Sequence, residues 1–240
     1  MSTRNSPVWR GKSPLLCYVT DRHGLGIANP AESLAPLKQK IEEVAAAGVD
    51  WVQIREKDLP ASELASLTGQ SVRIAKNLAA SRSSPIRVLV NDRLDVAVAE
   101  GAGGVHLGEK SLPVKEAKRL VQSMPRKQGI GESFLVGGSC HSLEAARAAE
   151  REGADYIFFG PVFATPSKDA FGPAQGIERL EQVCRTVSIP VLAIGGITPE
   201  NATFCRDAGA AGVAAIRMFQ DAHNLGGVVA AIRQAFNSSQ

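Results

Sequence analysis

The sequence has few cysteines, and none of them is placed for a metal site or a disulfide framework. The four lie far apart, with no CxxC pair and no Cys/His cluster at zinc-ligand spacing: Cys17, Cys140, Cys184 and Cys205. Zinc ribbons, zinc fingers and disulfide-rich folds all require closely spaced cysteines. We therefore expect reduced thiols, most of them in the core.

Long apolar runs and blocks of one charge are also missing. No stretch of about 18 apolar residues is uninterrupted, and the N-terminal segment MSTRNSPVWRGKSP lacks the apolar core of a signal peptide. The net charge of +3 comes from 27 basic and 24 acidic residues, without a Lys/Arg block or a basic and aromatic alternation. The sequence thus predicts a soluble cytoplasmic protein without a membrane or nucleic-acid partner, and it leaves a homo-oligomer open.

Short β-rich runs are frequent, and each is followed by a stretch with helical spacing. These stretches carry Ala or Leu on one face, charges on the other, and a glycine near the end, as in LKQKIEEVAAAGVD. Strands that are apolar on both faces and joined by helices form parallel sheets, and eight such units close into a barrel of about 250 residues. The eight runs are residues 15–20, 51–55, 87–92, 104–108, 134–139, 156–160, 191–196 and 212–218.

This alternation predicts an α/β protein, a single (β/α)8 TIM barrel. We expect one domain over residues 1–240, with 1–14 as a flexible or irregular N-terminal extension. An open doubly wound sheet would share the alternation, but no G-x-G-x-x-G follows the first strand, so its dinucleotide-binding version has little support. No linker or low-complexity segment divides the chain.

Polar side chains gather where the predicted strands end. In a parallel barrel these ends converge on one mouth, where such proteins place their chemistry. Arg55, Lys57 and Lys168 would bring three cations there, and Gly195 and Gly196 allow backbone N–H groups to approach a ligand. This combination favours phosphorylated small-molecule substrates. The other polar residues at these ends are Gln53, Asn91, Asp92, His106, Glu109, Ser111, Ser139, His141 and Arg217, the last of which would close strand eight.

Two carboxylates near these cations have different expected roles. Asp92 is well placed for Mg²⁺, which binds one or two carboxylates together with phosphate oxygens and waters. It could instead form a structural salt bridge with Arg93. Glu56 lies between two of the cations in sequence, but strand alternation points it away from them, so we expect it to orient a neighbouring cation.

Five segments, in this order, resemble a known family: VQIREK, VNDRLDVAVAEGAGGVHLG, GGSCHSLEAARAAEREGADYIFFGPVFATPSK, IPVLAIGGITPEN and AGAAGVAAI. The chain resembles thiamine phosphate synthase and its sister group, the thiazole tautomerases, from Leu15 to Phe236. The resemblance implies that hydroxymethylpyrimidine diphosphate loses pyrophosphate and that the nitrogen of a thiazole phosphate captures the resulting cation. Such chemistry needs stabilisation of the leaving group by cations and a metal, and no general base is obligatory.

The resemblance also implies roles for individual residues. The diphosphate end of the site would consist of Gln53, Arg55, Lys57, Asn91, Ser139 and Lys168, with Mg²⁺ on Asp92. The thiazole phosphate would be held by Thr165, Ser167, Gly195 and Gly196. The residues expected to be catalytic are Lys168, Ser139 and His141.

The sequence departs from the synthases at two positions. An acidic Mg²⁺ ligand normally stands two residues before the proline of the fourth loop, where this chain has Ser111. Glu109 could replace it only by a different loop path, and Lys110 beside it favours a more cationic, less metal-dependent pocket. A small serine normally ends the eighth strand, where this chain has Arg217. Its guanidinium could grip the thiazole phosphate or fill the space of the ring.

Two histidines bear on the alternatives. His141 matches the proton-transfer histidine of the tautomerases, but it could also merely cap the helix that begins near Ser142. His106 is expected to be a satisfied barrel residue. The NDR and GPVFATPSKDA segments favour a synthase, Ser111 and His141 favour an isomerase (a thiazole tautomerase), and both departures together favour a noncatalytic barrel that binds a thiazole or pyrimidine phosphate. We take the synthase as the first hypothesis.

Overall fold

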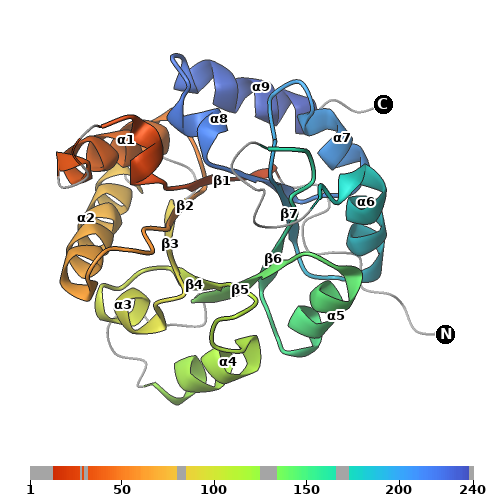
Figure 1. Ribbon diagram of the computed structural model, residues 1–240, viewed down its shortest axis with the longest axis horizontal. Coiled ribbons are helices and arrows are strands. Elements are labelled where there is room, and N and C mark those ends of the chain that lie inside the picture. The colour runs from red at the N-terminus through yellow and green to blue at the C-terminus, as the bar shows by residue number, and fades with distance from the viewer. Residues whose placement is uncertain are drawn as a thin grey trace.

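Eight parallel strands close into a ring (Figure 1). The computed structural model describes residues 13–27, 29, 32–79, 85–124, 134–165 and 173–237. Each strand pairs with its neighbours in chain order and β8 pairs with β1, so the predicted (β/α)8 barrel is confirmed. The strands are β1 (Leu15–Val19), β2 (Trp51–Ile54), β3 (Arg87–Asn91), β4 (Gly104–Leu107), β5 (Leu135–Cys140), β6 (Tyr156–Phe159), β7 (Val191–Ile194) and β8 (Gly212–Ala215).

Helices form the outer ring around the strands (Figure 1). In the first long helix, Leu37, Ile41 and Val44 recur at helical spacing and are buried. The helix ends at Ala47 and is capped by Gly48, whose φ of 113° suits glycine. None of the described helices combines the length and apolar character needed to span a membrane. The helices are η1 (Arg22–Leu25, a 3-10 helix), α1 (Leu34–Ala47), α2 (Ala61–Ala79), α3 (Leu94–Ala99), α4 (Val114–Ser123), α5 (Leu143–Arg151), α6 (Gly176–Thr186), α7 (Ala202–Asp207), α8 (Arg217–Gln220) and α9 (Leu225–Asn237).

The ends of two strands differ from the predicted runs. β8 ends at Ala215, and Arg217 begins the short helix α8, so the prediction that Arg217 closes strand eight is wrong. The reason is the backbone of Ile216, which turns into the helical region at φ −95° and ψ −77°. β5 begins and ends one residue later than predicted, with Cys140 as its last residue, so Ser139 lies inside a strand.

The lumen of the barrel is packed with side chains, which leaves its mouth as the place for a ligand. Gly137 on β5 makes room for a large ring here, because a Cβ at this position would lie 2.1 Å from Cζ of Tyr156. The buried cluster consists of Leu15, Cys17, Val19, Trp51, Leu89, Tyr156, Phe158, Leu192 and Ala214.

The four cysteines are free thiols, and all except the half-buried Cys184 are buried. Burial raises the pKa of each thiol, that of Cys140 to about 12, so the thiols stay protonated at neutral pH. Their low reactivity and their positions agree with the expected reduced core cysteines.

Candidate active site

The C-terminal ends of the strands carry one hollow beside β2 and β3 and another beside β7 and β8. All strands are parallel, so both hollows lie at the same end of the barrel. The first, of about 170 Å³, is lined by Ile54, Glu56, Lys57, Leu59, Leu64, Asn91, Asp92 and Arg93. The second, of about 450 Å³, is lined by Ala164, Thr165, Ile194, Gly195, Gly196, Ile197, Thr198, Pro199, Ala215, Ile216, Arg217 and Met218.

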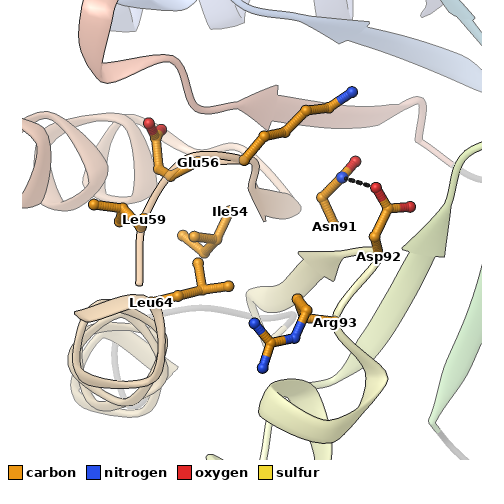
Figure 2. A pocket seen from close by; sticks show the side chains of 8 residues that line it. Ile54, Glu56, Leu59, Leu64, Asn91, Asp92 and Arg93 are labelled. Atoms are coloured by element: carbon orange, nitrogen blue, oxygen red, sulfur yellow. Dashed lines mark hydrogen bonds between the residues drawn. The ribbon is translucent and has the colours of Figure 1, made fainter. Parts of the chain in front are cut away.

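Asp92 lies at the centre of a hydrogen-bonded chain in the first hollow. Its Oδ2 accepts a bond of 2.7 Å from Asn91 Nδ2, which Figure 2 shows as a dashed line, and its Oδ1 accepts from Gly108 N at 3.0 Å. The hydroxyl of Ser111 also donates to Oδ1. Gln53 Nε2 donates to Asn91 Oδ1 at 2.9 Å and so holds the asparagine in turn. The carboxylate is therefore fixed in position before any ligand binds.

The backbone of Asp92 is strained as well. Its φ is 61°, and among the described residues it is the one non-glycine residue with a positive φ. Such a conformation persists where the surroundings impose it, and it often marks a functional site. A salt bridge between Asp92 and Arg93, the structural alternative, is not formed. Arg93 pairs with Asp95 instead, at 2.6 Å.

The donor set around Asp92 fits Mg²⁺ as a site that a ligand completes. Mg²⁺ requires near-octahedral oxygen ligation, often from one or two carboxylates together with phosphate oxygens and waters. Asp92 supplies one carboxylate, and Ser111 supplies a hydroxyl where the family resemblance leads us to expect an acid. Within the described ranges, no three or more His, Cys, Asp or Glu side chains gather as a metal-binding group, and Glu109 is exposed.

The backbone of Arg55, the first cation after β2, is held in place, and the charges of Arg55 and Lys57 stay available. Arg55 N donates to Thr20 Oγ1 at 2.9 Å, and that hydroxyl donates to Glu56 at 2.6 Å. In the part of the chain that the structure describes, no ion pair or hydrogen bond joins the side chain of Arg55 or Lys57 to a carboxylate. The arrangement leaves both charges for a ligand.

Glu56 does orient a cation, but the cation is Arg22 of the first loop. Glu56 is 4% exposed and accepts bonds of 3.2 Å from the backbone N–H and the guanidinium of Arg22. Figure 2 shows Glu56 on the side of the hollow away from Asn91 and Asp92. Arg22 also grips Asp58 through two bonds of 2.6 Å, which hold the pKa of that carboxyl well below its usual range. The pair thereby fastens the first loop to the second.

His106 is buried behind the mouth and is 2% exposed. Its Nδ1 lies 3.1 Å from the hydroxyl of Tyr156, its Nε2 lies 2.9 Å from Ser139 Oγ, and its ring centre lies 4.2 Å from that of Phe158. Burial lowers the pKa of His106 to about 3, with the charge of Asp92 opposing and that of Arg55 adding to the shift. The imidazole is therefore neutral at physiological pH and fully bonded, as expected of a barrel residue.

His141 does not cap α5. Ser142 is the cap, and its Oγ accepts a bond of 3.0 Å from Ala145 N. His141 Nδ1 instead contacts the carbonyl oxygen of Gly160, just after β6. The capping interpretation of His141 is therefore wrong.

The second hollow depends on glycine. Gly195 and Gly196 have φ of 97° and 65°, and a Cβ at Gly196 would lie 2.7 Å from the carbonyl oxygen of Ala164. Thr165 and Arg217 line the same hollow, and Arg217 is exposed. The loop after β6 also contains Ser167 and Lys168, which lie outside the described residues.

Several residues that shape the site were missed by sequence reasoning. Thr20 and Arg22 act through Glu56, and Tyr156 acts through His106. Each is separated from its partner by more than thirty residues in sequence, so no local motif joins them. The one signal in the sequence was strand alternation, which turns Glu56 away from the mouth and toward a partner elsewhere.

Comparisons with known proteins agree with this geometry. The sequence matches the family described as thiamine monophosphate synthase over residues 25–219. The chain belongs to the thiamine monophosphate synthase family. The resemblance drawn from the five sequence segments is therefore confirmed.

Individual members of the family are similar along most of the chain. A thiamine-phosphate synthase of Methanoculleus marisnigri is 45% identical over 199 residues, covering 83% of this chain and 84% of the relative. A thiamine-phosphate synthase of Coprothermobacter proteolyticus is 36% identical over 200 residues, covering 83% and 87%. Among solved structures, the thiamine phosphate pyrophosphorylase from Pyrococcus furiosus has a TM-score of 0.74 at 28% identity, over 92% of this chain and 95% of that one.

Proposed function

We propose that this chain is a thiamine-phosphate synthase, a transferase that joins hydroxymethylpyrimidine diphosphate to a thiazole phosphate and releases pyrophosphate. Family membership supports the reaction class. The observation that carries the proposal is that one mouth holds two unlike hollows. One combines Lys57 with a fixed carboxylate, and the other combines paired glycines with Arg217. Two different phosphorylated substrates would suit these two hollows.

The diphosphate would bind to Arg55 and Lys57. As the bond to the pyrimidinylmethyl carbon breaks, negative charge collects on the departing pyrophosphate, so preorganised cations stabilise the transition state more than the bound substrate. Neither side chain has its charge neutralised by a described carboxylate. Ser139 and Lys168 would add donors to the same oxygens. Lys168 lies outside the described residues, and its role stays a prediction of the sequence.

The side-chain oxygen of Gln53 is suited to a hydrogen-bond donor of the substrate, rather than to the diphosphate predicted from the sequence. Its Nε2 is bonded to Asn91, and its Oε1 is buried without a hydrogen-bond partner among the described residues. A buried acceptor in this state calls for a donor, whereas a diphosphate offers only acceptors. We assign Gln53 Oε1 to an N–H of the pyrimidine, such as a ring amino group. Asn91 would then assist indirectly by orienting Asp92.

The thiazole phosphate would occupy the second hollow. Gly195 and Gly196 allow backbone N–H groups to come close to a phosphate, and Thr165 adds a hydroxyl. Arg217 offers a planar fork that matches phosphate oxygens. Apolar neighbours such as Ile194 suit the ring. Ser167 was assigned here from the sequence and lies outside the described residues.

Asp92 would hold Mg²⁺ together with oxygens of the diphosphate, since the chain supplies one carboxylate at this point. When bound, the ion would neutralise charge on the leaving group. Ser111 and Asn91 keep the carboxylate in place. Ser139 and His141 complete the residues assigned to catalysis, and His141 stands at the edge of the mouth against Gly160. Location in the cytoplasm and a homo-oligomeric state stay predictions of the sequence.

A turnover assay tests the proposal. The purified chain is incubated with hydroxymethylpyrimidine diphosphate and thiazole phosphate, with and without Mg²⁺, and thiamine phosphate and pyrophosphate are both measured. We expect equal amounts of the two products, no pyrophosphate release when thiazole phosphate is replaced by buffer, and a strong dependence on Mg²⁺. A metal-independent isomerisation that requires His141, with no pyrophosphate at any Mg²⁺ concentration, would replace the synthase by a thiazole tautomerase.

A further inference from the structure

Behind Ser139 lies a buried hydrogen-bonded pair that the proposed reaction does not use directly. The hydroxyl of Tyr156 lies 3.1 Å from His106 Nδ1, and His106 Nε2 lies 2.9 Å from Ser139 Oγ. Tyr156 is 1% exposed and His106 is 2% exposed, whereas Ser139 is half-buried at the mouth. Gly137 leaves space for the tyrosine ring, which a Cβ at that position would overlap. The three side chains form a line from the lumen to the mouth.

The direction of these hydrogen bonds follows from the need to satisfy a buried hydroxyl. In the described part of the chain, the partner of the Tyr156 hydroxyl is His106 Nδ1. A buried O–H that donates to nothing loses its hydration without replacement, so this hydroxyl donates to Nδ1. A neutral imidazole carries one N–H, which must then be on Nε2. The ring is buried, and in the described part of the chain its two nitrogens face hydroxyls and no carboxylate, so no bonded partner stabilises a charged imidazole.

We propose that Tyr156 and His106 are positioning residues that orient the hydroxyl of Ser139 as a hydrogen-bond donor into the mouth. With the proton on Nε2, His106 donates to Ser139 Oγ, and the serine proton is left to point toward a ligand. In the opposite tautomer, His106 Nε2 would accept the proton of Ser139. The serine oxygen would then present only its lone pairs to the mouth, and these repel an anion. The chemical class recognised by Ser139 is therefore an anionic oxygen. That this oxygen belongs to the leaving pyrophosphate rests on the proposed function.

The tautomer can be observed without any activity. In protein labelled with nitrogen-15 histidine, the ring nitrogen that carries the proton and the bare one have distinct chemical shifts, and loss of the signals in His106→Gln assigns them. We expect the proton on Nε2 in the native chain. We expect Tyr156→Phe to shift the ring toward the Nδ1–H form or a mixture, because the phenol donor is gone. A native ring with its proton on Nδ1 overturns the proposal.

A double-mutant cycle then tests whether the pair acts through Ser139. Tyr156→Phe should lower kcat by about 5- to 30-fold in the native background and by less than about 2-fold when Ser139→Ala is already present. The matched control is Tyr18→Phe, which removes another buried hydroxyl, one that donates to Gln220 Oε1 at 2.9 Å on the far side of the barrel wall. Tyr18→Phe should change kcat by the same factor in the native background and in Ser139→Ala.

The two measurements keep failure of the proposal separate from failure of the proposed reaction. If Tyr156→Phe has equal effects in both backgrounds, or leaves kcat unchanged, the positioning role is wrong although the enzyme is a synthase. If the chain shows no synthase activity, binding of inorganic pyrophosphate by calorimetry replaces kcat in the same cycle. If Tyr156→Phe weakens pyrophosphate binding equally with Ser139 and with Ser139→Ala, the proposal is overturned. If it weakens binding only when Ser139 is present, the proposal is supported.

Discussion

The two sides of the barrel mouth are built by different means. Beside β2 and β3, side chains are fixed by hydrogen bonds to one another. The carboxylate of Asp92, for example, accepts three, from Asn91, Gly108 and Ser111. Beside β7 and β8, the hollow is shaped by backbone, with glycines at positions where a Cβ would meet neighbouring atoms. During the proposed reaction negative charge collects on phosphate oxygens on the first side, where a leaving group departs, whereas the phosphate bound on the second side keeps its charge. Side-chain charge therefore concentrates where it can act on the transition state.

The largest expected effect is from Asp92→Asn. Asparagine tolerates the positive φ of this position and keeps the shape of the side chain, but it removes the charge that would hold Mg²⁺. We expect kcat to fall by about 10²- to 10³-fold at saturating substrates, the range seen for loss of one preorganised electrostatic group. The control is Asp95→Asn in the first turn of α3, which removes the ion-pair partner of Arg93 and should leave the rate near the native one. Equal rates for both variants would exclude Asp92 as the metal ligand.

On the other side of the mouth, Gly196→Ala tests backbone shape. Gly196 and Gly101 have the same φ of 65°, but a Cβ at Gly196 meets Ala164 O and Phe163 Cβ at 2.7 Å, whereas a Cβ at Gly101 meets nothing within 4 Å. We expect Gly196→Ala to lower the free energy of unfolding by about 1–3 kcal/mol more than Gly101→Ala, measured in urea. It should also raise KM for thiazole phosphate. Equal losses of stability would show that close packing at Gly196 is unimportant.

Arg217→Ser tests whether the pocket beside β7 and β8 contributes to substrate binding rather than to the rate of the chemical step. The substitution removes a guanidinium that lines the larger hollow and pairs with no described carboxylate. We expect KM for thiazole phosphate to rise about 10-fold with kcat changed by less than about 3-fold, because the phosphate of this substrate carries the same charge before and during the reaction. The KM of Arg217→Lys should lie between those of the native chain and Arg217→Ser, since lysine keeps the positive charge but lacks the planar pair of guanidinium N–H donors. An improved affinity in Arg217→Ser would mean that the arginine fills the space of the ring.

The smallest effect is expected from Ser111→Asp. A second carboxylate beside Asp92 should lower the Mg²⁺ concentration for half-maximal turnover by about 3- to 10-fold, since Mg²⁺ prefers one or two carboxylates with its phosphate oxygens. The maximal rate should hardly change, and no new activity should arise. Ser111→Ala is the control that removes the hydroxyl without adding charge. A Mg²⁺ requirement that is the same in both variants would place the metal away from residue 111.

The sequence by itself determined the barrel and which polar residues gather at its mouth. Alternating apolar runs and amphipathic stretches can bury themselves in few ways, and a closed parallel barrel is one of them. Parallel strands then bring their C-terminal ends together, so the sequence pattern alone assigns Lys57, Asp92, Gly195 and Arg217 to one end of the molecule. The departure at Ser111 is also visible in the sequence, because it lies two residues before Pro113, just after a recognisable segment that ends at Gly108.

Only the tertiary structure decided which of the polar residues near the mouth already have hydrogen-bond or ion-pair partners within the protein. Glu56 binds Arg22 rather than a site cation, Gln53 has an acceptor left over, and Arg217 opens a short helix after β8 has ended. The tautomer of His106 depends on Tyr156, fifty residues away along the chain. Hydrogen bonds between residues on different strands follow from register and side-chain packing, and neither is encoded by the local periodicity that reveals a strand.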